Sequence, residues 1–148
     1  MRIFVGADHN GYHLKEQVEN YLRSLGHDVV DDGGKELNPK DDFTVYASRV
    51  AVDVLGTDGA RGILICGSGQ GMVIAANRYK GIRAGLGWSS EAAASIRTDE
   101  DSNVLALPSE ILDGHAQQWQ EIIDTWLRTE FAGAPRYVRR NKQLDEIG

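Results

Sequence analysis

The only cysteine of the chain lies where an apolar segment runs into a glycine-rich turn. Residues 62–66 predict a strand buried on both faces, and residues 72–77 predict the start of a helix. Three alternate glycines lie between them, at Gly67, Gly69 and Gly71. They let backbone N–H groups approach a ligand closely, and the helix N-terminus favours a thiolate or an oxyanion beside Cys66. Considered alone, a single cysteine is more often a small buried apolar side chain.

Length and composition narrow the class of protein. The 148 residues fit one α/β domain, residues 1–148, with a sizeable core. No segment is apolar enough to span a membrane and no secretory leader is recognisable, so we expect a cytoplasmic protein with no membrane partner. One cysteine forms no internal disulfide and no metal cluster, which fits a reducing compartment. The net charge of -6 disfavours nucleic acid as a partner, because the phosphate backbone would be repelled.

Apolar and amphipathic segments alternate along the chain. We expect strands at residues 3–7, 29–30, 62–66, 82–86 and 103–107. We expect helices at residues 14–25, 45–55, 69–78, 89–98 and 111–130. The apolar side chains of the last of these helices belong to the core or to a dimer contact: Trp119, Ile122, Ile123 and Trp126. The order predicts a three-layer αβα sandwich around a doubly wound five-stranded parallel sheet, Rossmann-like or flavodoxin-like, with a C-terminal helical extension.

Chemistry-bearing residues follow several of the predicted strands. Ligands bind such a sheet at the carboxyl ends of its strands, where the strand order reverses. Asp8 and His9 follow the first strand, and Cys66 ends the third. A carboxylate, an imidazole and a thiol would therefore meet at one edge. Taken separately, Asp8 would equally cap the following helix and His9 would lie in a solvent-facing loop.

Two familiar kinds of site do not fit these residues. A cysteine-dependent phosphatase needs an arginine six positions after the thiol, and Met72 occupies that position. A dinucleotide fingerprint places its glycines after the first strand, whereas these glycines follow the third. We therefore expect neither a phosphatase nor an NAD-binding protein.

Four segments form a recognisable set of motifs: Asp8–Gly11, Gly62–Asn77, Gly81–Ala84 and Asn103–Ala106. Together they closely resemble the type B ribose-5-phosphate isomerases and the related galactose-6-phosphate isomerases, along essentially the whole chain and in order. The resemblance implies aldose–ketose isomerisation of a small phosphorylated sugar, without a metal or any other cofactor. It also implies a homodimer, sometimes paired into tetramers, whose sites lie at the subunit interface.

The resemblance implies roles for several residues of the first two motifs. Cys66 is the base that moves a proton between adjacent carbons through a cis-enediolate, and Ser68 passes a proton between the two oxygens. Backbone N–H groups hold the enediolate oxygen, from Gly67, Gly69, Gln70 and Gly71. Asp8 and His9 contact the sugar and its phosphate.

Two arginines near the C-terminus supply positive charge. Arg136 and Arg140 lie one helical turn apart on a single face. Such a pair can clamp a phosphate bidentately, although composition alone favours a solvated basic tail. The resemblance implies that both bind the phosphate, while the family's usual histidine after the first of them is Tyr137 here.

Two segments depart from the family's motifs. Where the family has His-Asn-Asp, with the histidine credited with opening the furanose ring, this chain has Asp99-Glu100-Asp101. Asp99 would take the histidine's catalytic place and Glu100 would line the substrate site, yet a carboxyl group donates a proton poorly at neutral pH unless burial raises its pKa. Where the family has an arginine that helps to bind phosphate, this chain has Glu110.

These departures leave several interpretations open. The acids form an ordinary solvated loop, or they select a substrate that is already open-chain, is differently configured or depends less on phosphate charge. A third interpretation is a non-catalytic sugar-phosphate-binding relative or partner subunit, which the retained Cys66 disfavours. A general phosphate-binding or redox module is disfavoured, because the resemblance is to isomerases throughout and no second cysteine is present for disulfide exchange.

Overall fold

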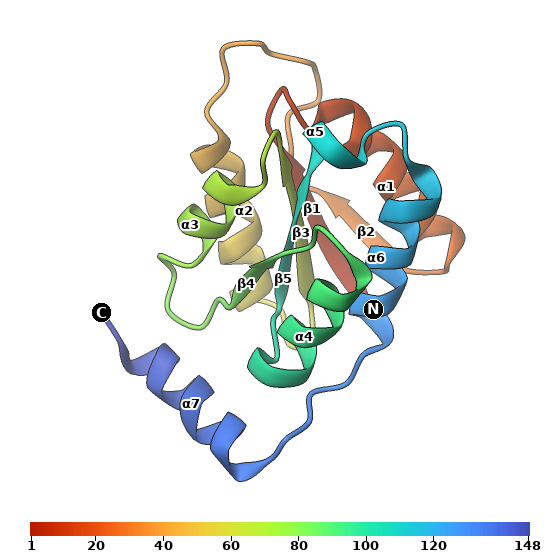
Figure 1. Ribbon diagram of the computed structural model, residues 1–148. Helices are drawn as coiled ribbons and strands as arrows, with labels where there is room; N and C mark the ends of the chain where they lie inside the picture. Colours follow the sequence, from red (N-terminus) through yellow and green to blue (C-terminus); the bar gives the residue numbers. More distant parts are fainter.

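A computed structural model describes residues 1–148 and confirms the predicted α/β sandwich (Figure 1). All five strands run parallel, in the order β2-β1-β3-β5-β4. The strands are β1 (Arg2–Ala7), β2 (Asp28–Asp31), β3 (Arg61–Cys66), β4 (Ala84–Leu86) and β5 (Val104–Pro108). The helices are α1 (Tyr12–Ser24), α2 (Phe43–Leu55), α3 (Gln70–Ala76), α4 (Ser90–Glu100), α5 (Ser109–Leu112), α6 (Ala116–Arg128) and α7 (Pro135–Glu146). None of these helices is long and apolar enough to cross a membrane.

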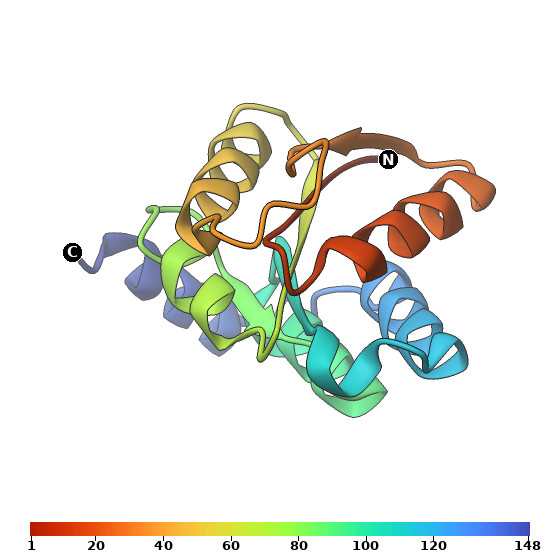
Figure 2. The ribbon, with the colours of Figure 1, turned by 90° about the horizontal axis from the view of Figure 1, so that it is seen from above.

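The helices bury the two faces of the sheet in two separate cores (Figure 2). Helices α1, α4 and α6 cover one face, while α2 and α3 cover the other. β3 lies at the centre, and its side chains alternate between the cores, so Ile63 and Ile65 face α1 while Leu64 and Cys66 face α2 and α3. Because both faces are covered, a continuous apolar run is the sequence this strand needs. The predicted core positions of α6 are confirmed, since all four lie buried in the first core: Trp119, Ile122, Ile123 and Trp126.

Two predicted elements have different bounds in the structure. The single helix expected at 111–130 is wrong, because the chain breaks at Gly114, whose φ of 81° does not continue a right-handed helix. The fourth strand begins only at Ala84. Before it, the Arg83 amide donates to the Asn103 side chain, at 2.9 Å, instead of pairing with a strand.

The connections place β3 between two points where the strand order reverses, because neighbouring strands lead to helices on opposite faces of the sheet. β1 leads into α1 and β5 leads into α5 and α6 on one face, whereas β3 leads into α3 on the other face. The carboxyl end of β3 therefore lies where doubly wound sheets bind ligands. Helix α7 lies apart from both helical layers, on the side of the sheet away from the carboxyl ends of the strands (Figure 1).

Candidate functional site

Cys66 lies at the carboxyl end of β3 and is 6% exposed. Burial raises the pKa of its thiol, and hydrogen bonds from the backbone amides of Met72, Gly69 and Ser68 oppose that rise without cancelling it. The nearby charge of Asp8 raises the pKa further. The expected stabilisation by amides is present, but the expectation that it favours the thiolate overall is wrong, because desolvation outweighs it. Cys66 is therefore a buried thiol whose pKa lies above its ordinary value.

The glycines after Cys66 allow the loop to fold tightly around the thiol. Gly69 has a φ of 75°, and a Cβ there would lie 2.5 Å from the Leu86 side chain. A Cβ at Gly71 would lie 3.0 Å from the ring of Phe43. Neither position accepts a larger residue without movement of its neighbours. The Gln70 amide donates to the hydroxyl of the exposed Ser68, at 3.3 Å, at the start of the short helix α3.

Asp8 lies beside this loop, at the end of β1, and is 6% exposed. Its Oδ1 accepts hydrogen bonds from the amides of Asn10, at 3.0 Å, and Gly11, at 3.2 Å. Gly11 lies so close to β3 that a Cβ would come within 2.5 Å of the Ile65 carbonyl oxygen. Burial raises the pKa of Asp8, and the two amides oppose that rise. One carboxylate oxygen therefore fixes the turn into α1, while Oδ2 has no hydrogen-bond partner in the chain.

His9 is held by a residue that the sequence did not reveal. Asp41, in the segment between β2 and α2, accepts hydrogen bonds from the His9 amide at 3.0 Å and from His9 Nδ1 at 2.7 Å. The hydrogen bond to Asp41 raises the pKa of His9, more than burial lowers it. Asp41 is 32 residues away along the chain, and no sequence signal joins it to His9.

Three ligand atoms at this edge lie close enough to share a metal ion, from Asp8, His9 and Asp41, within 4.8 Å of one another. Asp8 Oδ1 is already occupied by two amides, and His9 Nδ1 by Asp41 Oδ1. Two of the ligand atoms are thus already hydrogen-bonded within the chain, and we assign no metal to this group.

Glu110 also lies at this edge, on α5. Its amide donates to the Gly67 carbonyl at 3.0 Å, and its Oε1 would lie 2.7 Å from a Cβ on Gly67. The neighbouring Ser109 hydroxyl donates to the Asn10 carbonyl at 2.8 Å, which joins the ends of β1 and β5. The negative charge expected at this position is thus next to the Cys66 loop of its own chain. We call the side chains at this edge the strand-end group: Asp8, His9, Cys66, Ser68 and Glu110.

Asp99 and Glu100 lie at the opposite edge of the sheet. Helix α4 starts beside the carboxyl end of β4 and runs for 11 residues, about 16 Å, back to the amino end of β5. Both acids occupy its last turn. Burial, then the charge of Asp99, raises the pKa of Glu100. Asp101 ends the helix in the left-handed region, with a φ of 49°, and its carboxylate is paired with Arg97 at 2.7 Å.

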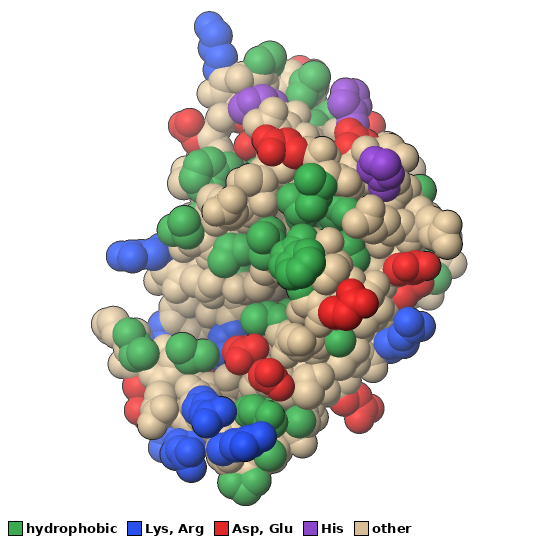
Figure 3. Space-filling view, in the orientation of Figure 1, with side chains coloured by type: hydrophobic (Ala, Val, Ile, Leu, Met, Phe, Trp, Pro, Cys, Tyr) green, Lys and Arg blue, Asp and Glu red, His purple; other side chains and the backbone are tan.

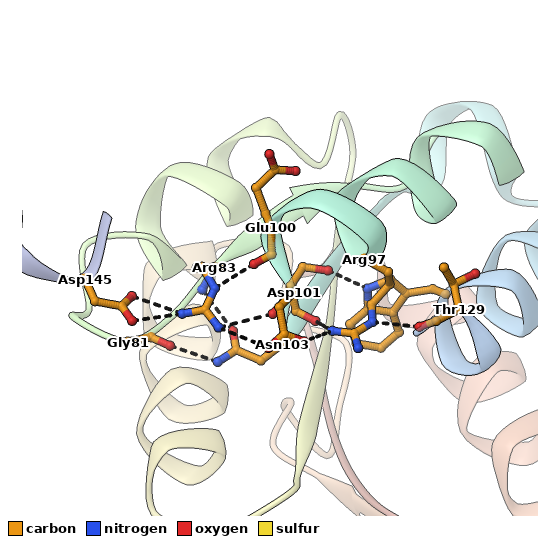
Figure 4. A network of polar contacts seen from close by, with 10 residues as sticks. Gly81, Arg83, Arg97, Glu100, Asp101, Asn103, Thr129 and Asp145 are labelled. Carbon is orange, nitrogen blue, oxygen red and sulfur yellow. Dashed lines mark hydrogen bonds and ion pairs between the residues drawn. The ribbon is translucent and has the colours of Figure 1, made fainter. Parts of the chain in front are cut away.

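Arg83 joins the end of α4 to α7 (Figure 4). Its guanidinium donates to the backbone carbonyls of Glu100, at 2.7 Å, and Asp101, at 3.3 Å. It also pairs with both carboxylate oxygens of Asp145, at 3.0 and 3.1 Å. This is the one ion pair between α7 and the rest of the chain. Arg83 therefore sets the position of α7 relative to α4.

Helix α7 carries the two predicted phosphate-binding arginines. Arg136 and Arg140 are both exposed and lie on one face of the helix. The guanidinium of Arg136 stacks 4.9 Å from the centre of the Tyr137 ring. Figure 3 shows basic side chains gathered over α7 with acidic side chains beside them. We call the polar side chains of α4 and α7 the helix group: Asp99, Glu100, Arg136 and Arg140.

The structure brings the strand-end group together and keeps the helix group away from it. A thiol at a reversal point of a doubly wound sheet, with polar side chains from the neighbouring strand ends, defines an α/β enzyme acting on a small polar molecule.

Comparisons with known proteins narrow this class. The sequence profile of the Ribose/Galactose Isomerase family matches residues 3–144. A ribose 5-phosphate isomerase from Thermotoga maritima has a similar structure, with a TM-score of 0.92 and 39% identity over 99% of this chain and 98% of that one. Ribose-5-phosphate isomerase B from Mycoplasma genitalium, solved with bound ribulose-5-phosphate, has a TM-score of 0.91 and 34% identity over 98% of this chain and 94% of that one. Ribose-5-phosphate isomerase B from Escherichia coli K12 is 37% identical over 146 residues, covering 99% of this chain and 95% of its own length.

The chain belongs to the ribose/galactose isomerase family. It is therefore an isomerase, and the resemblance carried by its four sequence motifs is confirmed.

Proposed function

We propose that residues 1–148 form a single isomerase domain that interconverts an aldose phosphate and the matching ketose phosphate, with Cys66 as the catalytic base. The Cys66 thiolate removes the proton from the carbon beside the carbonyl, which gives a cis-enediolate, and the thiol returns the proton to the neighbouring carbon. Ser68 passes the other proton between the two oxygens. The electrons stay within the substrate, so the reaction needs no external oxidant or reductant.

The observation that carries the proposal is the position of the thiol. The amides of Met72, Gly69 and Ser68 lower the pKa of Cys66 by hydrogen bonding, and the charge of Asp8 raises it. The same loop offers N–H groups to a substrate oxygen that becomes negative, and one such donor contributes about 3 kcal/mol in other enzymes. A buried thiol with a raised pKa is a stronger base once it is ionised, which suits the removal of a proton from carbon.

We propose further that two copies of the chain complete each site. The strand-end group contains the thiol but no arginine, and the helix group contains two arginines but no thiol. A homodimer in which the helix group of one copy faces the strand-end group of the other supplies both. Exposed apolar side chains on α2 and α3 support contact with a second copy: Val45, Val52 and Ile74. Pairing of such dimers into tetramers is compatible with the same arrangement.

The acids at the site point to a substrate with a high open-chain fraction. Asp99 occupies the position of the family's ring-opening histidine, and Glu110 places a negative charge beside the Cys66 loop. We therefore propose a tetrose phosphate, which forms no furanose phosphate ring, as a better substrate than ribose 5-phosphate. The competing proposal is that Asp99 opens the ring itself.

A non-catalytic sugar-phosphate-binding role is the second candidate, because the site lacks a histidine for ring opening. The retained Cys66 with its amide contacts opposes it. The thiol is a free cysteine that must stay reduced to act as a base, so we place the enzyme in a reducing compartment such as the cytoplasm.

An assay of four-, five- and six-carbon aldose phosphates tests these proposals together. We expect turnover of at least one of them, which Cys66→Ala abolishes, whereas binding without turnover would establish the non-catalytic role. Asp99→His should then accelerate the reaction of ribose 5-phosphate selectively. If Asp99 opens the ring itself, Asp99→Asn will instead disable turnover of cyclic sugars and spare open-chain ones. Fast turnover of ribose 5-phosphate that Asp99→Asn leaves unchanged would contradict both substrate proposals.

A further inference from the structure

Asp41 holds His9 more firmly than a surface contact would. Asp41 Oδ1 accepts both the His9 amide and His9 Nδ1, at 3.0 and 2.7 Å, so it fixes the backbone and the ring together. The Asp41 side chain is only 9% exposed, while that of His9 is 31% exposed. The carboxylate is therefore shielded from water, and the ring it orients still reaches solvent.

The geometry leaves one ring nitrogen available to a ligand. A carboxylate accepts hydrogen bonds and donates none, so the proton between the two groups lies on Nδ1. His9 Nε2 has no hydrogen-bond partner in the chain, and Asp8 next to it lines the same edge as Cys66. An imidazole fixed through Nδ1 presents Nε2 in one defined direction.

The carboxylates around His9 favour the protonated, positively charged form of its ring. The groups that affect it are the carboxylates of Asp8 and Asp41, and Asp41 in turn accepts a hydrogen bond from the hydroxyl of Tyr46. Glu110 adds a third carboxylate beside the Cys66 loop. Among the strand-end group, His9 is the only side chain able to carry positive charge, and it has acids on both sides.

We propose that Asp41 is a positioning residue that keeps the His9 imidazole protonated and aims Nε2–H at the anionic end of the substrate. The inference rests on the proposed function for the identity of that substrate, and its chemical class is a phosphate monoester. His9 then supplies part of the positive charge that is missing at Glu110, where the family has an arginine.

The hydrogen bonds explain why the pair stays ionised. The hydrogen bond to Asp41 raises the pKa of His9, burial opposes it, and the charges of Asp8 and Asp41 add to the rise. Burial raises the pKa of Asp41, but hydrogen bonds from His9 and Tyr46 outweigh it and the net direction is down. Because the pKa of His9 is raised, the cation and its contribution to folding are present below the ordinary histidine range and are lost as the pH rises through the raised value.

The test compares the natural protein with Asp41→Asn, and Asp42→Asn serves as the matched control because Asp42 is an exposed neighbouring acid that caps no amide. NMR titration of the His9 ring, assigned with His9→Gln, should show a lower pKa in Asp41→Asn than in the natural protein or the control. Inorganic phosphate should shift the His9 resonances, and it should bind Asp41→Asn more weakly on the order of tenfold at pH 7.5, the loss expected for one hydrogen bond to a charged group.

Kinetics provide the readout that a purely structural role would not change. We expect Asp41→Asn to raise KM for the phosphorylated sugar increasingly from pH 6 to pH 8 while kcat changes little. An unchanged His9 titration, or phosphate binding that is equal in the two proteins, would overturn the inference. If the natural protein turns over no sugar phosphate, the proposed function fails, and the titration and the phosphate binding still decide whether Asp41 governs His9.

Discussion

The strand-end group and the helix group differ in how the fold holds them. Cys66 and Asp8 lie at the ends of neighbouring central strands, nearly without exposure; backbone amides hold the Asp8 carboxylate by hydrogen bonds and lower the pKa of Cys66 against the effect of burial. Arg136 and Arg140 stand on the exposed face of a helix that one ion pair, Arg83 with Asp145, joins to the rest of the chain.

This difference matches the work that each group is proposed to do. Proton transfer to and from carbon requires a base held within a fraction of an ångström, which strand ends packed on both faces provide. Binding of a remote phosphate tolerates a helix that adjusts its position. The helix group also carries two of the three acids that depart from the family's motifs, at Asp99 and Glu100. On this proposal the chemistry is kept in the buried group, while substrate choice varies mostly in the exposed one.

Replacement of the base should have the largest effect. Cys66→Ala should leave the fold intact and abolish isomerisation, and Cys66→Ser should be nearly as inactive, because a hydroxyl is a far weaker base than a thiolate. Circular dichroism and thermal unfolding check the fold, and a coupled assay measures the rate. Activity above about a tenth of the natural value in Cys66→Ala, a loss below roughly 1.4 kcal/mol in barrier, would remove Cys66 from the mechanism. In the natural enzyme kcat should rise with pH, because burial raises the pKa of the thiol.

Removal of the arginines should have the next largest effect and a different signature. Arg136→Ala and Arg140→Ala should each raise KM for a phosphorylated sugar more than they lower kcat, because phosphate binding is shared by the ground and transition states. The unphosphorylated sugar should be much less affected. Arg139→Ala, an exposed arginine off that face, is the control. Equal losses on both sugars would show that these arginines do not bind the phosphate.

Loss of the ion pair between α7 and Arg83 should also raise KM, but by less. Asp145→Asn frees α7 from Arg83, and KM for the phosphorylated sugar should rise about threefold, as expected for loss of a partly exposed pair worth less than 1 kcal/mol. Arg83→Ala should raise KM further, because it also removes the contacts with the end of α4. A change in kcat alone would argue against a positioning role for this pair.

Much of the fold and of the strand-end group could be predicted from the sequence. The apolar run at 62–66 and the alternating glycines after it identify a buried strand and a tight loop, because no other element needs that combination. The carboxyl-edge rule then brings Asp8, His9 and Cys66 together without knowledge of any contact. The break at Gly114 also had a sequence signal, since Asp113-Gly114 is a common turn pair.

The remaining features depend on contacts that no local pattern records. Asp41 meets His9 only because the long segment after β2 folds back over the edge of the sheet. The direction of the Cys66 pKa depends on whether burial or amide contacts dominate, and only the packed structure decides this. The separation of Asp99 from Cys66 follows from the direction of α4, which returns to the amino edge before β5.

Substitution of Asp32, which lies outside both groups, should change the stability of the protein and have the smallest effect on activity. Burial, then the charge of Asp53, raises the pKa of Asp32 to about 7, and its Oδ2 is buried without a partner. An acid whose pKa is raised in the folded state destabilises the protein as the pH rises from its unfolded value near 4 to about 7. Asp32→Asn should therefore raise the free energy of unfolding at pH 8 by about 1 kcal/mol and leave it unchanged at pH 4. Urea unfolding at both pH values measures this, and equal effects at the two would contradict it.

The central claim, that one copy supplies the base and the other the arginines, is tested most directly with mixed dimers. One chain carries Cys66→Ala, the other carries Arg136→Ala and Arg140→Ala, and two different affinity tags isolate the dimer that contains both. Such a dimer has one complete site of two, so we predict about half the natural activity at subsaturating substrate. Activity no higher than the average of the two parent proteins would contradict the claim, because each site would then be built from a single chain.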